Sequence, residues 1–397
     1  MAARATIDPD RRAVILILDG VGCGAAPDSA AYGDEGSDTI GNLARAVGGL
    51  CLPNLQRLGL GNLSSIPGVD PVASPSGGWG TMLPRSAGKD STTGHWEIAG
   101  LHLAKAFPTY PDGFPPSVLR AFSEATGRSV IANTVASGTA VIDAFAEEQG
   151  RSGAWIVYTS ADSVFQIAAN EEWIPLEELY KACETARRQL VAPDDVSRVI
   201  ARPFRGTPGA WKRTANRRDY SIQPPGTTLL DVLAAAGVQR DGVGKVDDLF
   251  AGRSLRARHT ADNSEGISAL LDWLSGPARG FCFANLVDFD QLYGHRNDVR
   301  GFQGALEDFD RALPILLSAL RENDLLFITA DHGNDPTTLS TDHARERVPL
   351  LAVGARARGG PLGERDTFSD LGATVADWFG LGWRGRGTSF LASLIGA

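Results

Sequence analysis

Residues 13–20 read AVILILDG, six apolar residues followed at once by an aspartate and a glycine. A short continuous apolar run of this kind is typical of a strand buried on both faces of a parallel sheet. Two later stretches have the same form: residues 281–290 read FCFANLVDFD, and residues 325–333 read LLFITADHG. Ligands bind outside the carboxyl ends of the strands in an open α/β sheet, so we expect the acids that follow these runs to meet there.

A helix is predicted between the second and third runs, because apolar residues recur there every three or four positions. The series consists of Phe302, Leu306, Phe309, Leu313, Leu316 and Leu320. Pro314 is a point at which this helix could kink. A strand, a helix and a strand in this order form a βαβ unit, and the sequence therefore predicts a doubly wound α/β core.

Length and composition narrow the class of protein. The 397 residues suffice for two or three domains, and 38 Lys and Arg against 47 Asp and Glu give a formal net charge of −9, which disfavours a nucleic acid partner. No apolar run approaches the roughly 20 residues that cross a bilayer, and the first residues lack the features of a signal peptide. We therefore expect a cytoplasmic protein with no membrane partner. The four cysteines, without a CxxC spacing, are expected to be reduced: Cys23, Cys51, Cys183 and Cys282.

Two proline-rich stretches flank the middle of the chain, FPTYPDGFPPS at residues 107–117 and SIQPPGTT at residues 221–228. Such stretches are typical of crossings between domains. Strands are expected at residues 130–132, 154–159 and 199–202, and a helix at residues 175–190. The predicted organisation is a core of residues 1–103 and 224–397 with an inserted α/β domain at residues 104–223.

Three of the six histidines lie in acid-rich segments of the last third of the chain. The segments are DFDQLYGH at residues 288–295, ADHGND at residues 330–335 and TDH at residues 341–343. Carboxylates and imidazoles without thiolates suit Mn²⁺, Zn²⁺, Fe²⁺ or Mg²⁺. A single Asp-Gly pair is usually only a turn and a single histidine is usually structural, but their coincidence with several strand ends favours a site for two metals.

The stretch GKDSTTGHWEIAG at residues 88–100 contains three consecutive hydroxyl side chains. A hydroxyl beside a metal can be ionised and act as a nucleophile. Serine and threonine are also good helix caps, particularly with Glu97 downstream. The two interpretations are compatible, because the N-terminus of a helix also stabilises a phosphate.

Together these motifs resemble the phosphopentomutase family of the alkaline phosphatase superfamily over nearly the whole chain. The similar stretches are ILDGVGCGAAPD, GKDSTTGHWEIAG, YTSADSVFQIAANEE, ARPF, RTANRRDY, GVGKVDDLFAG, ANLVDFDQLYGHRNDV, TADHGNDP and TDHARERVP. The resemblance implies an alkaline-phosphatase-like core with an inserted cap domain. It also implies the interconversion of ribose 1-phosphate and ribose 5-phosphate, or of the deoxyribose pair, through a phosphoenzyme and a sugar bisphosphate such as glucose 1,6-bisphosphate.

The resemblance assigns site residues one position at a time. One Mn²⁺ would be held by Asp19, Asp331, His332 and Ser91, and the second by Asp290, His295 and His343. Asp290 is preferred to Asp288 because the family spacing to the histidine is five residues. Ser91 is expected to be the phosphoryl acceptor, because it directly follows Lys89-Asp90 and stands four residues before His95.

Substrate contacts are also implied by the resemblance. Asp162 would bind the ribose hydroxyls, and Arg213, Arg217 and Lys245 the distal phosphate, although each could equally be a surface charge. The chain departs from the family at Ser91, where threonine is usual, and at Asn170, Arg218 and Arg347, where histidine is usual. These departures leave the sugar open. A mutase for a modified pentose, a phosphohydrolase, a phosphoglycerate mutase and a non-catalytic sugar-phosphate sensor remain alternatives, with small sugar phosphates as the expected partners.

Overall fold

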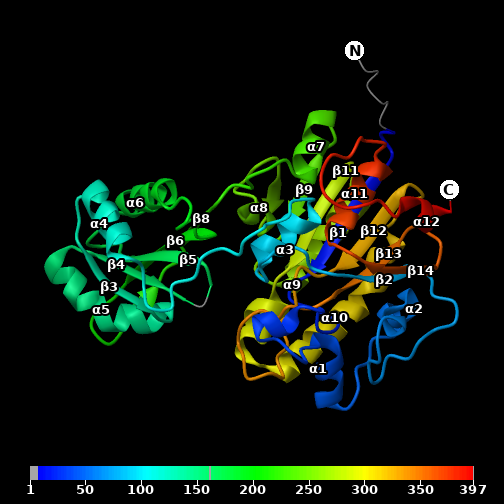
Figure 1. Cartoon of the computed structure of the whole chain (residues 1–397), viewed down its shortest axis with the longest axis horizontal. Coiled ribbons are helices and arrows are strands. Elements are labelled where there is room, and N and C mark those ends of the chain that lie inside the picture. Colours follow the sequence, from blue (N-terminus) through cyan, green and yellow to red (C-terminus); the bar gives the residue numbers. More distant parts are fainter. Residues whose placement is uncertain (1–7, 161, 397) are drawn as a thin grey trace. The chain divides into compact units, whose positions relative to one another are not determined.

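The computed structural model describes residues 8–160 and 162–396 of the chain. The chain forms two compact units, which we name the core unit (residues 1–106 with 224–397) and the middle unit (residues 107–223). Each unit has its own sheet and its own helices (Figure 1).

The core unit is built on an eight-stranded sheet with the strand order β10-β9-β11-β1-β12-β13-β2-β14. The strands are β1 (Arg12–Leu18), β2 (Gly78–Met82), β9 (Arg240–Val243), β10 (Arg256–Arg258), β11 (Gly280–Leu286), β12 (Asp324–Thr329), β13 (Val348–Val353) and β14 (Gly360–Arg365). β1 lies between β11 and β12 and is parallel to both, with Leu18 opposite Leu286 and Ile17 opposite Thr329. The three predicted runs are thus neighbouring parallel strands, and their carboxyl ends share one edge of the sheet.

The direction of β13 is a feature that the apolar pattern does not reveal. β13 runs antiparallel to both of its neighbours, β12 and β2, so the sheet is mixed. Every residue of β1, β12 and β13 is buried. A strand covered on both faces reads as a continuous apolar run in either direction, so the pattern predicts the strand but not its orientation.

Helices cover both faces of the core sheet, as the doubly wound prediction requires (Figure 1). One group that packs together consists of α1 (Thr39–Val47), α2 (Pro53–Leu58), α9 (Asn263–Ser275) and α10 (Val299–Ser318). The other consists of α3 (Ser91–Ile98), α7 (Leu229–Ala236), α8 (Val246–Leu249) and α11 (Ser369–Trp378), with α12 (Leu391–Ile395) against α11. Short helical turns add η1 (Ser29–Tyr32), η2 (Leu60–Asn62), the π-helical η3 (Phe289–Tyr293) and η4 (Gly294–Arg296).

α10 confirms the helix predicted from apolar spacing. Its buried side chains include those predicted from Phe302 to Leu316, whereas Leu320 lies beyond the end of the helix. Pro314 lies inside α10 on its exposed side, and the helix continues through it. No described helix combines the length and the apolar character that a bilayer span requires.

The middle unit has a six-stranded sheet in which β8 pairs with β6 beside the path β3-β4-β5-β6-β7. The strands are β3 (Val130–Val135), β4 (Trp155–Thr159), β5 (Val164–Asn170), β6 (Arg198–Arg205), β7 (Lys212–Arg213) and β8 (Arg218–Ser221). The helices are α4 (Pro116–Thr126), α5 (Gly138–Ser152) and α6 (Leu176–Gln189). One apolar cluster includes Phe122 of α4 and Cys183 of α6, and a second includes Val141 of α5, so this sheet too is covered on both faces.

β5 is a strand that the sequence analysis missed. Its seven residues are all buried, although Gln166 and Asn170 interrupt the apolar run. Both polar side chains find partners inside the unit: Gln166 Oε1 accepts a hydrogen bond from Arg202 at 3.1 Å, and Asn170 Oδ1 accepts one from the Glu172 amide at 2.9 Å. Polar residues interrupt the apolar run of a buried strand, and a partner such as Arg202, 36 positions from Gln166, is not evident from the local sequence.

Candidate metal centre

The acids expected at the strand ends converge at the carboxyl edge of the core sheet. Asp19 directly follows β1, Asp331 follows β12, and Asp290 lies in the π-helical turn after β11. All three are less than a tenth exposed. The parallel register of β1 with β11 and β12 explains why residues so far apart in sequence meet at one place.

The first cluster, which we call the Asp19 triad, consists of Asp19, Asp331 and His332. Its potential ligand atoms lie within 4.8 Å of one another. His332 Nε2 is 3.4 Å from both Asp19 Oδ1 and Asp331 Oδ2. The Nδ1 of His332 donates to the Gly333 carbonyl at 3.1 Å, which leaves the Nε2 lone pair for the triad.

The second cluster, the Asp290 triad, consists of Asp290, His295 and His343, and its potential ligand atoms also lie within 4.8 Å of one another. The Nε2 atoms of His295 and His343 lie 3.2 and 3.4 Å from the two oxygens of Asp290. The Nδ1 of His295 donates to the Thr341 carbonyl at 2.7 Å and so fixes this ring as well. The triads adjoin, because the rings of His332 and His343 are 4.1 Å apart between centroids.

The ionisation of these groups follows from burial and from their neighbours. Burial, reinforced by Asp331, raises the pKa of Asp19. Burial also opposes the charge on Asp290, but the attraction of His343 and the hydrogen bonds from both histidines hold its pKa well below the ordinary value. Burial disfavours a charged His332, yet Asp331 and the other aspartates raise its pKa well above the ordinary value. The raised pKa values of Asp19 and His332 thus both reflect the close spacing of the aspartates at this edge.

Two carboxylate oxygens of the Asp19 triad lack a hydrogen bond of good geometry from any described residue. They are Asp19 Oδ1 and Asp331 Oδ2, both buried. Buried carboxylate oxygens are costly unless a donor or a cation meets them. The donor set of oxygens and imidazole nitrogens suits hard and borderline divalent cations. The residues present therefore fit a divalent cation at each triad.

Ser91 is the hydroxyl that faces the triads. It is the first residue of α3, and its Oγ lies 3.1 Å from His332 Nε2. The helix is capped not by a hydroxyl residue but by Asp90, whose carboxylate accepts hydrogen bonds from the Thr93 amide at 3.1 Å and the Thr93 hydroxyl at 2.6 Å. The cap thus occupies Thr93 and leaves Ser91 available at the end of the helix.

Asp288 is placed differently from Asp290. Its Oδ2 accepts a hydrogen bond from the Asn263 amide at 2.7 Å, and its own amide donates to Asn263 Oδ1 at 3.0 Å. Asp288 therefore serves the start of α9, whereas the structure brings Asp290 to the histidines.

Among the residues at this edge to which the sequence assigned no function are His95 and Arg345. His95 is fully buried, and its Nδ1 lies 2.9 Å from the Ser91 carbonyl and 3.1 Å from Asp331 Oδ2. Arg345 is buried and donates to the carbonyls of Ser86 at 2.6 Å and Gly88 at 2.8 Å, in the loop that leads into α3. His95 lies in the stretch GKDSTTGHWEIAG and Arg345 in TDHARERVP, but the fold determines which residues they contact.

The remaining predicted residues lie in different surroundings. Lys245 is exposed in the core unit, just after β9. In the middle unit, Asp162 pairs with Arg198 at 3.6 Å, and Arg217 makes two hydrogen bonds of 2.6 Å to Asp219. Arg217 is therefore committed to a carboxylate.

Arg213 belongs to a basic cluster of the middle unit. It is exposed on β7, and its Nη1 lies 3.5 Å from the position that a Cβ would take on Gly138, the first residue of α5. The Tyr158 hydroxyl is 2.9 Å from the same point and is buried without a partner among the described residues. Nearby, burial and then the charge of Arg217 lower the pKa of Arg202 to about 10. This cluster is a place where an anion would be stabilised.

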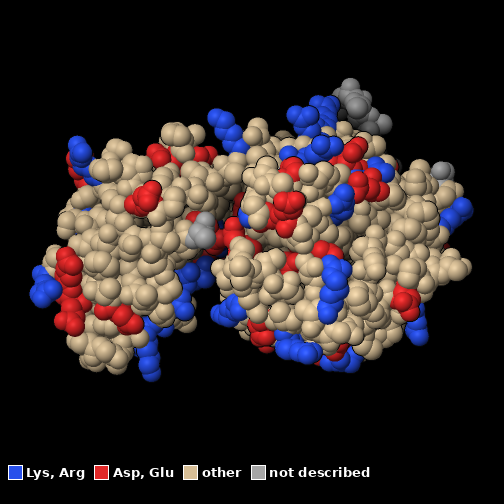
Figure 2. All heavy atoms as spheres, turned by 60° about the horizontal axis from the view of Figure 1, so that its bottom comes forward, with Lys and Arg blue, Asp and Glu red and all other residues tan. Residues whose placement is uncertain are grey.

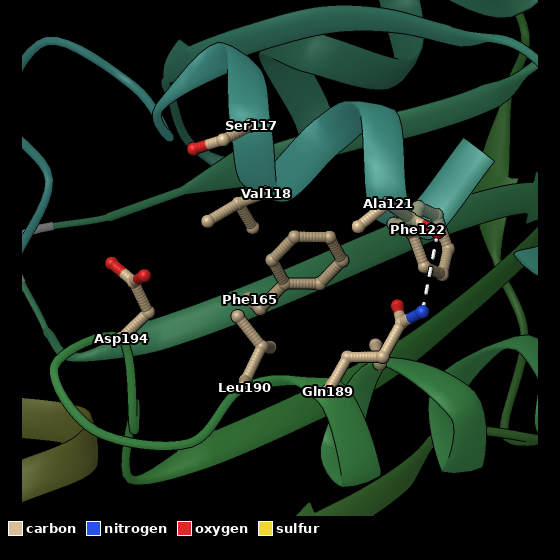
Figure 3. A pocket seen from close by; sticks show the side chains of 9 residues that line it. Ser117, Val118, Ala121, Phe122, Phe165, Gln189, Leu190 and Asp194 are labelled. Carbon is tan, nitrogen blue, oxygen red and sulfur yellow. Dashed lines mark hydrogen bonds between the residues drawn. The ribbon is translucent and has the colours of Figure 1, made fainter. Parts of the chain in front are cut away.

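Two other surface features, a pocket and the charge distribution of one face, have fewer groups suited to catalysis than the triads have. A pocket of about 210 Å³ lies between α4 and α6, with an apolar floor around Phe165 and with Asp194 at its rim (Figure 3). Its polar groups include the Ser117 hydroxyl and the Asp194 carboxylate, whose Oδ1 accepts a hydrogen bond from the Tyr110 hydroxyl at 2.6 Å. Lysine and arginine side chains are scattered among acidic ones on the face shown in Figure 2, without a continuous basic surface in that view.

The chain is similar to known metalloenzymes in sequence and in fold. The profile of the Metalloenzyme superfamily matches residues 11–382. A phosphopentomutase of Anaeromyxobacter sp. (strain K) is 55% identical over 97% of this chain and 99% of its own, and one of Desulfitobacterium hafniense (strain DSM 10664 / DCB-2) is 54% identical over 97% and 100%. A solved structure of phosphoglycerate mutase from Leishmania mexicana has a TM-score of 0.52 at 12% identity, over 97% of this chain and 99% of the other, which is a likeness of fold.

Proposed function

The chain belongs to the phosphopentomutase family of the Metalloenzyme superfamily, and on that basis we propose that this pentose phosphate mutase interconverts ribose 1-phosphate and ribose 5-phosphate, or the deoxyribose pair, through a phosphoserine. The observation that carries the proposal is the Ser91 hydroxyl, 3.1 Å from His332 Nε2, at the meeting point of two carboxylate and histidine triads.

The chain's residues divide between holding cations and transferring phosphate. Asp19, Asp331, His332 and Ser91 would hold one divalent cation, proposed to be Mn²⁺, and the Asp290 triad the second. Bound there, the cations would neutralise the charge of the phosphoryl group and favour an ionised hydroxyl. Ser91 is the first residue of α3, so a phosphate on its oxygen would lie at the N-terminus of that helix, where an anion is stabilised.

In the proposed reaction, Ser91 carries the phosphoryl group between two transfers. Phosphoserine 91 gives its phosphoryl group to the free hydroxyl of the sugar monophosphate, and the proton of that hydroxyl passes to the Ser91 oxygen or to water. The resulting sugar bisphosphate turns and returns its other phosphoryl group to the Ser91 oxygen, whose proton passes to the sugar oxygen that leaves, giving the isomeric monophosphate. A sugar bisphosphate such as glucose 1,6-bisphosphate would phosphorylate the free enzyme and start the cycle.

We assign the distal phosphate to Arg213 and Lys245 and the ribose hydroxyls to Asp162. Arg213 is supported by its exposed position beside the N-terminus of α5 and the unpartnered Tyr158 hydroxyl. Arg217 would act with less freedom, since Asp219 already binds its guanidinium through two hydrogen bonds.

Of the four departures from the family pattern, Ser91 lies at the Asp19 triad and the other three lie in packing contacts. Asn170 is fully buried in β5, the Arg218 guanidinium stacks 3.9 Å over the Tyr180 ring, and Arg347 donates to Glu364 at 2.6 Å. None of these contacts involves a residue of either triad. Ribose and deoxyribose phosphates therefore remain the proposed substrates, in preference to a modified pentose.

A coupled mutase assay with ribose, deoxyribose and modified pentose 1- and 5-phosphates tests this proposal. The enzyme, loaded with Mn²⁺ and glucose 1,6-bisphosphate, is expected to turn over the first two and to lose activity on chelation. Release of inorganic phosphate without isomerisation would indicate a phosphohydrolase instead, and binding without turnover would indicate a sensor.

A further inference from the structure

Each triad is held from outside by one buried asparagine. Asn285, near the end of β11, donates from Nδ2 to Asp19 Oδ2 at 2.8 Å. Asn334 donates from Nδ2 to Asp290 Oδ1 at 2.7 Å. A carboxylate can only accept, so the amide nitrogen must face it in both cases. Both asparagines are at most 3% exposed. Each one therefore fixes one oxygen of one aspartate, away from water.

The Asn334 side chain has little freedom to move. A Cβ on Gly20 would lie 3.0 Å from the Asn334 Cβ, and a Cβ on Gly294 would lie 2.5 Å from its Cγ. Gly20 follows Asp19, and Gly294 precedes His295. The amide is thus enclosed between the loop of one triad and the loop of the other, and any larger residue at either glycine would displace it.

Asn334 also belongs to the chain segment of the opposite triad. It lies two residues after His332, and its amide donates to the Gly20 carbonyl at 2.8 Å. Its backbone is therefore anchored beside the Asp19 triad while its side chain serves the Asp290 triad. Asn285 has no such double attachment, since its amide reaches Asp19 from within the sheet.

We propose that Asn285 and Asn334 are positioning residues that tune the two cation sites separately, Asn285 through Asp19 and Asn334 through Asp290. The inference rests on the proposed pair of cations. An aspartate with one oxygen fixed by an amide presents the other oxygen in one direction, so a ligand does not have to order it on binding. Loss of such an outer partner typically lowers metal affinity by roughly 10- to 100-fold.

Single-site proteins make the assignment testable. His343→Ala keeps the Asp19 triad, and Asp19→Ala keeps the Asp290 triad. Metal-free protein is titrated with Mn²⁺ and the free ion is measured by electron paramagnetic resonance. In the His343→Ala background, Asn285→Ala is expected to weaken Mn²⁺ binding by roughly 10- to 100-fold and Asn334→Ala by less than about 3-fold. In the Asp19→Ala background, Asn334→Ala is expected to cause the large loss of Mn²⁺ affinity and Asn285→Ala the small one.

The outcomes separate this inference from the proposed function. Equal effects of the two asparagines in either background would overturn their separate roles, and no effect of either would overturn positioning. If a single-site protein binds Mn²⁺ too weakly to titrate, Asn285→Ala and Asn334→Ala in the otherwise intact chain should each leave one tight and one weakened site, and two unchanged sites would refute the inference. Fewer than two sites in the unsubstituted protein would instead refute the cation pair.

Circular dichroism and the melting temperature of the metal-free protein check the fold of each variant. Asn→Ser replaces Asn→Ala wherever alanine prevents folding, because the serine hydroxyl is too short to reach the aspartate. The same loss of affinity is then expected.

Discussion

The central strands β1 and β12 have buried charges at both ends, and the two ends differ in how well those charges are satisfied. At the amino end, Arg12 lies opposite Asp324, and Arg12 Nε donates to Asp324 Oδ1 at 2.8 Å. Arg12 also donates to the Leu274 carbonyl at 3.0 Å. At the carboxyl end, Asp19 and Asp331 each keep a buried oxygen without a good hydrogen bond from the described residues.

Burial is the same at the two ends, so burial alone does not distinguish structure from function. Arg12 and Asp324 are 1% exposed, and Asp19 and Asp331 are 4% and 2% exposed. A buried pair whose donors and acceptors are matched needs nothing further. Buried oxygens without partners are stable only if something else meets them, and here that is the proposed cation pair. The following substitutions test this difference between the two ends.

The largest effect is expected from Ser91→Ala at the carboxyl end. Loss of the hydroxyl removes the phosphoryl acceptor, so kcat should fall by roughly 10⁴-fold or more. Thr92→Val is the matched control, because Thr92 is its buried neighbour and has no proposed role. Mass spectrometry after incubation with glucose 1,6-bisphosphate should find the phosphate on Ser91. Stoichiometric phosphate on Thr92 or Thr93 would contradict the assignment.

The next comparison sets Asp331→Asn against Asp324→Asn. Asp331→Asn should weaken Mn²⁺ binding and lower activity by roughly 10²-fold. It should change the free energy of unfolding of the metal-free protein less than Asp324→Asn does. Asp324→Asn leaves the charge of Arg12 buried without its carboxylate and should lower the free energy of unfolding by about 3–5 kcal/mol, with kcat little changed. Denaturant unfolding with chelator and the mutase assay measure the two quantities. Similar changes in unfolding free energy and in activity for both variants would contradict the proposed difference between the two ends.

The sequence predicted the carboxyl end better than it predicted what supports it. Asp19, Asp290 and Asp331 follow apolar runs, and such runs in series place their ends together. The asparagines, His95 and Arg345 gave no comparable signal, because their partners are residues far away in the chain: Asn285 and Asp19, for example, are 266 positions apart. A hydrogen bond of that kind depends on strand order and register, and no local pattern records either.

A smaller effect is expected in the middle unit, where charges lie at the surface. Arg213→Ala should raise KM for the sugar phosphate by roughly 10- to 100-fold, the value of one or two charge-assisted hydrogen bonds, and leave Mn²⁺ content unchanged. Lys212→Ala is the matched control, since Lys212 is the other residue of β7 and is also exposed. Equal KM values for the two variants would remove Arg213 from the proposed phosphate site.

Glu346 is a third kind of buried carboxyl, close to the triads in sequence but satisfied by its neighbours. It is 1% exposed, and it accepts hydrogen bonds from the Thr39 amide at 2.9 Å and the Thr39 hydroxyl at 2.8 Å. Burial raises its pKa to about 8, although the Thr39 hydrogen bonds oppose the shift. Because its oxygens have hydrogen-bond partners within the fold, we interpret Glu346 as a structural residue.

The smallest effect on activity is therefore expected from Glu346→Gln, which should change stability alone. The pKa is raised from 4.5 to about 8 on folding, so the folded protein holds a proton that the unfolded chain releases. Its contribution to stability is present below about pH 4.5 and is lost as the pH rises to about 8. Each pH unit in that window lowers the free energy of unfolding by up to about 1.4 kcal/mol, and glutamine, which cannot ionise, should not incur this loss.

Denaturant unfolding of the metal-free protein at pH 5, 6.5 and 8 should thus show a free energy of unfolding that depends less on pH for Glu346→Gln than for the unsubstituted chain. Glu364→Gln, at an exposed site, is the control. Parallel curves for Glu346→Gln and the unsubstituted protein would show that Glu346 is ionised in the fold, and its carboxylate would then join the negative charge at the carboxyl end of the sheet.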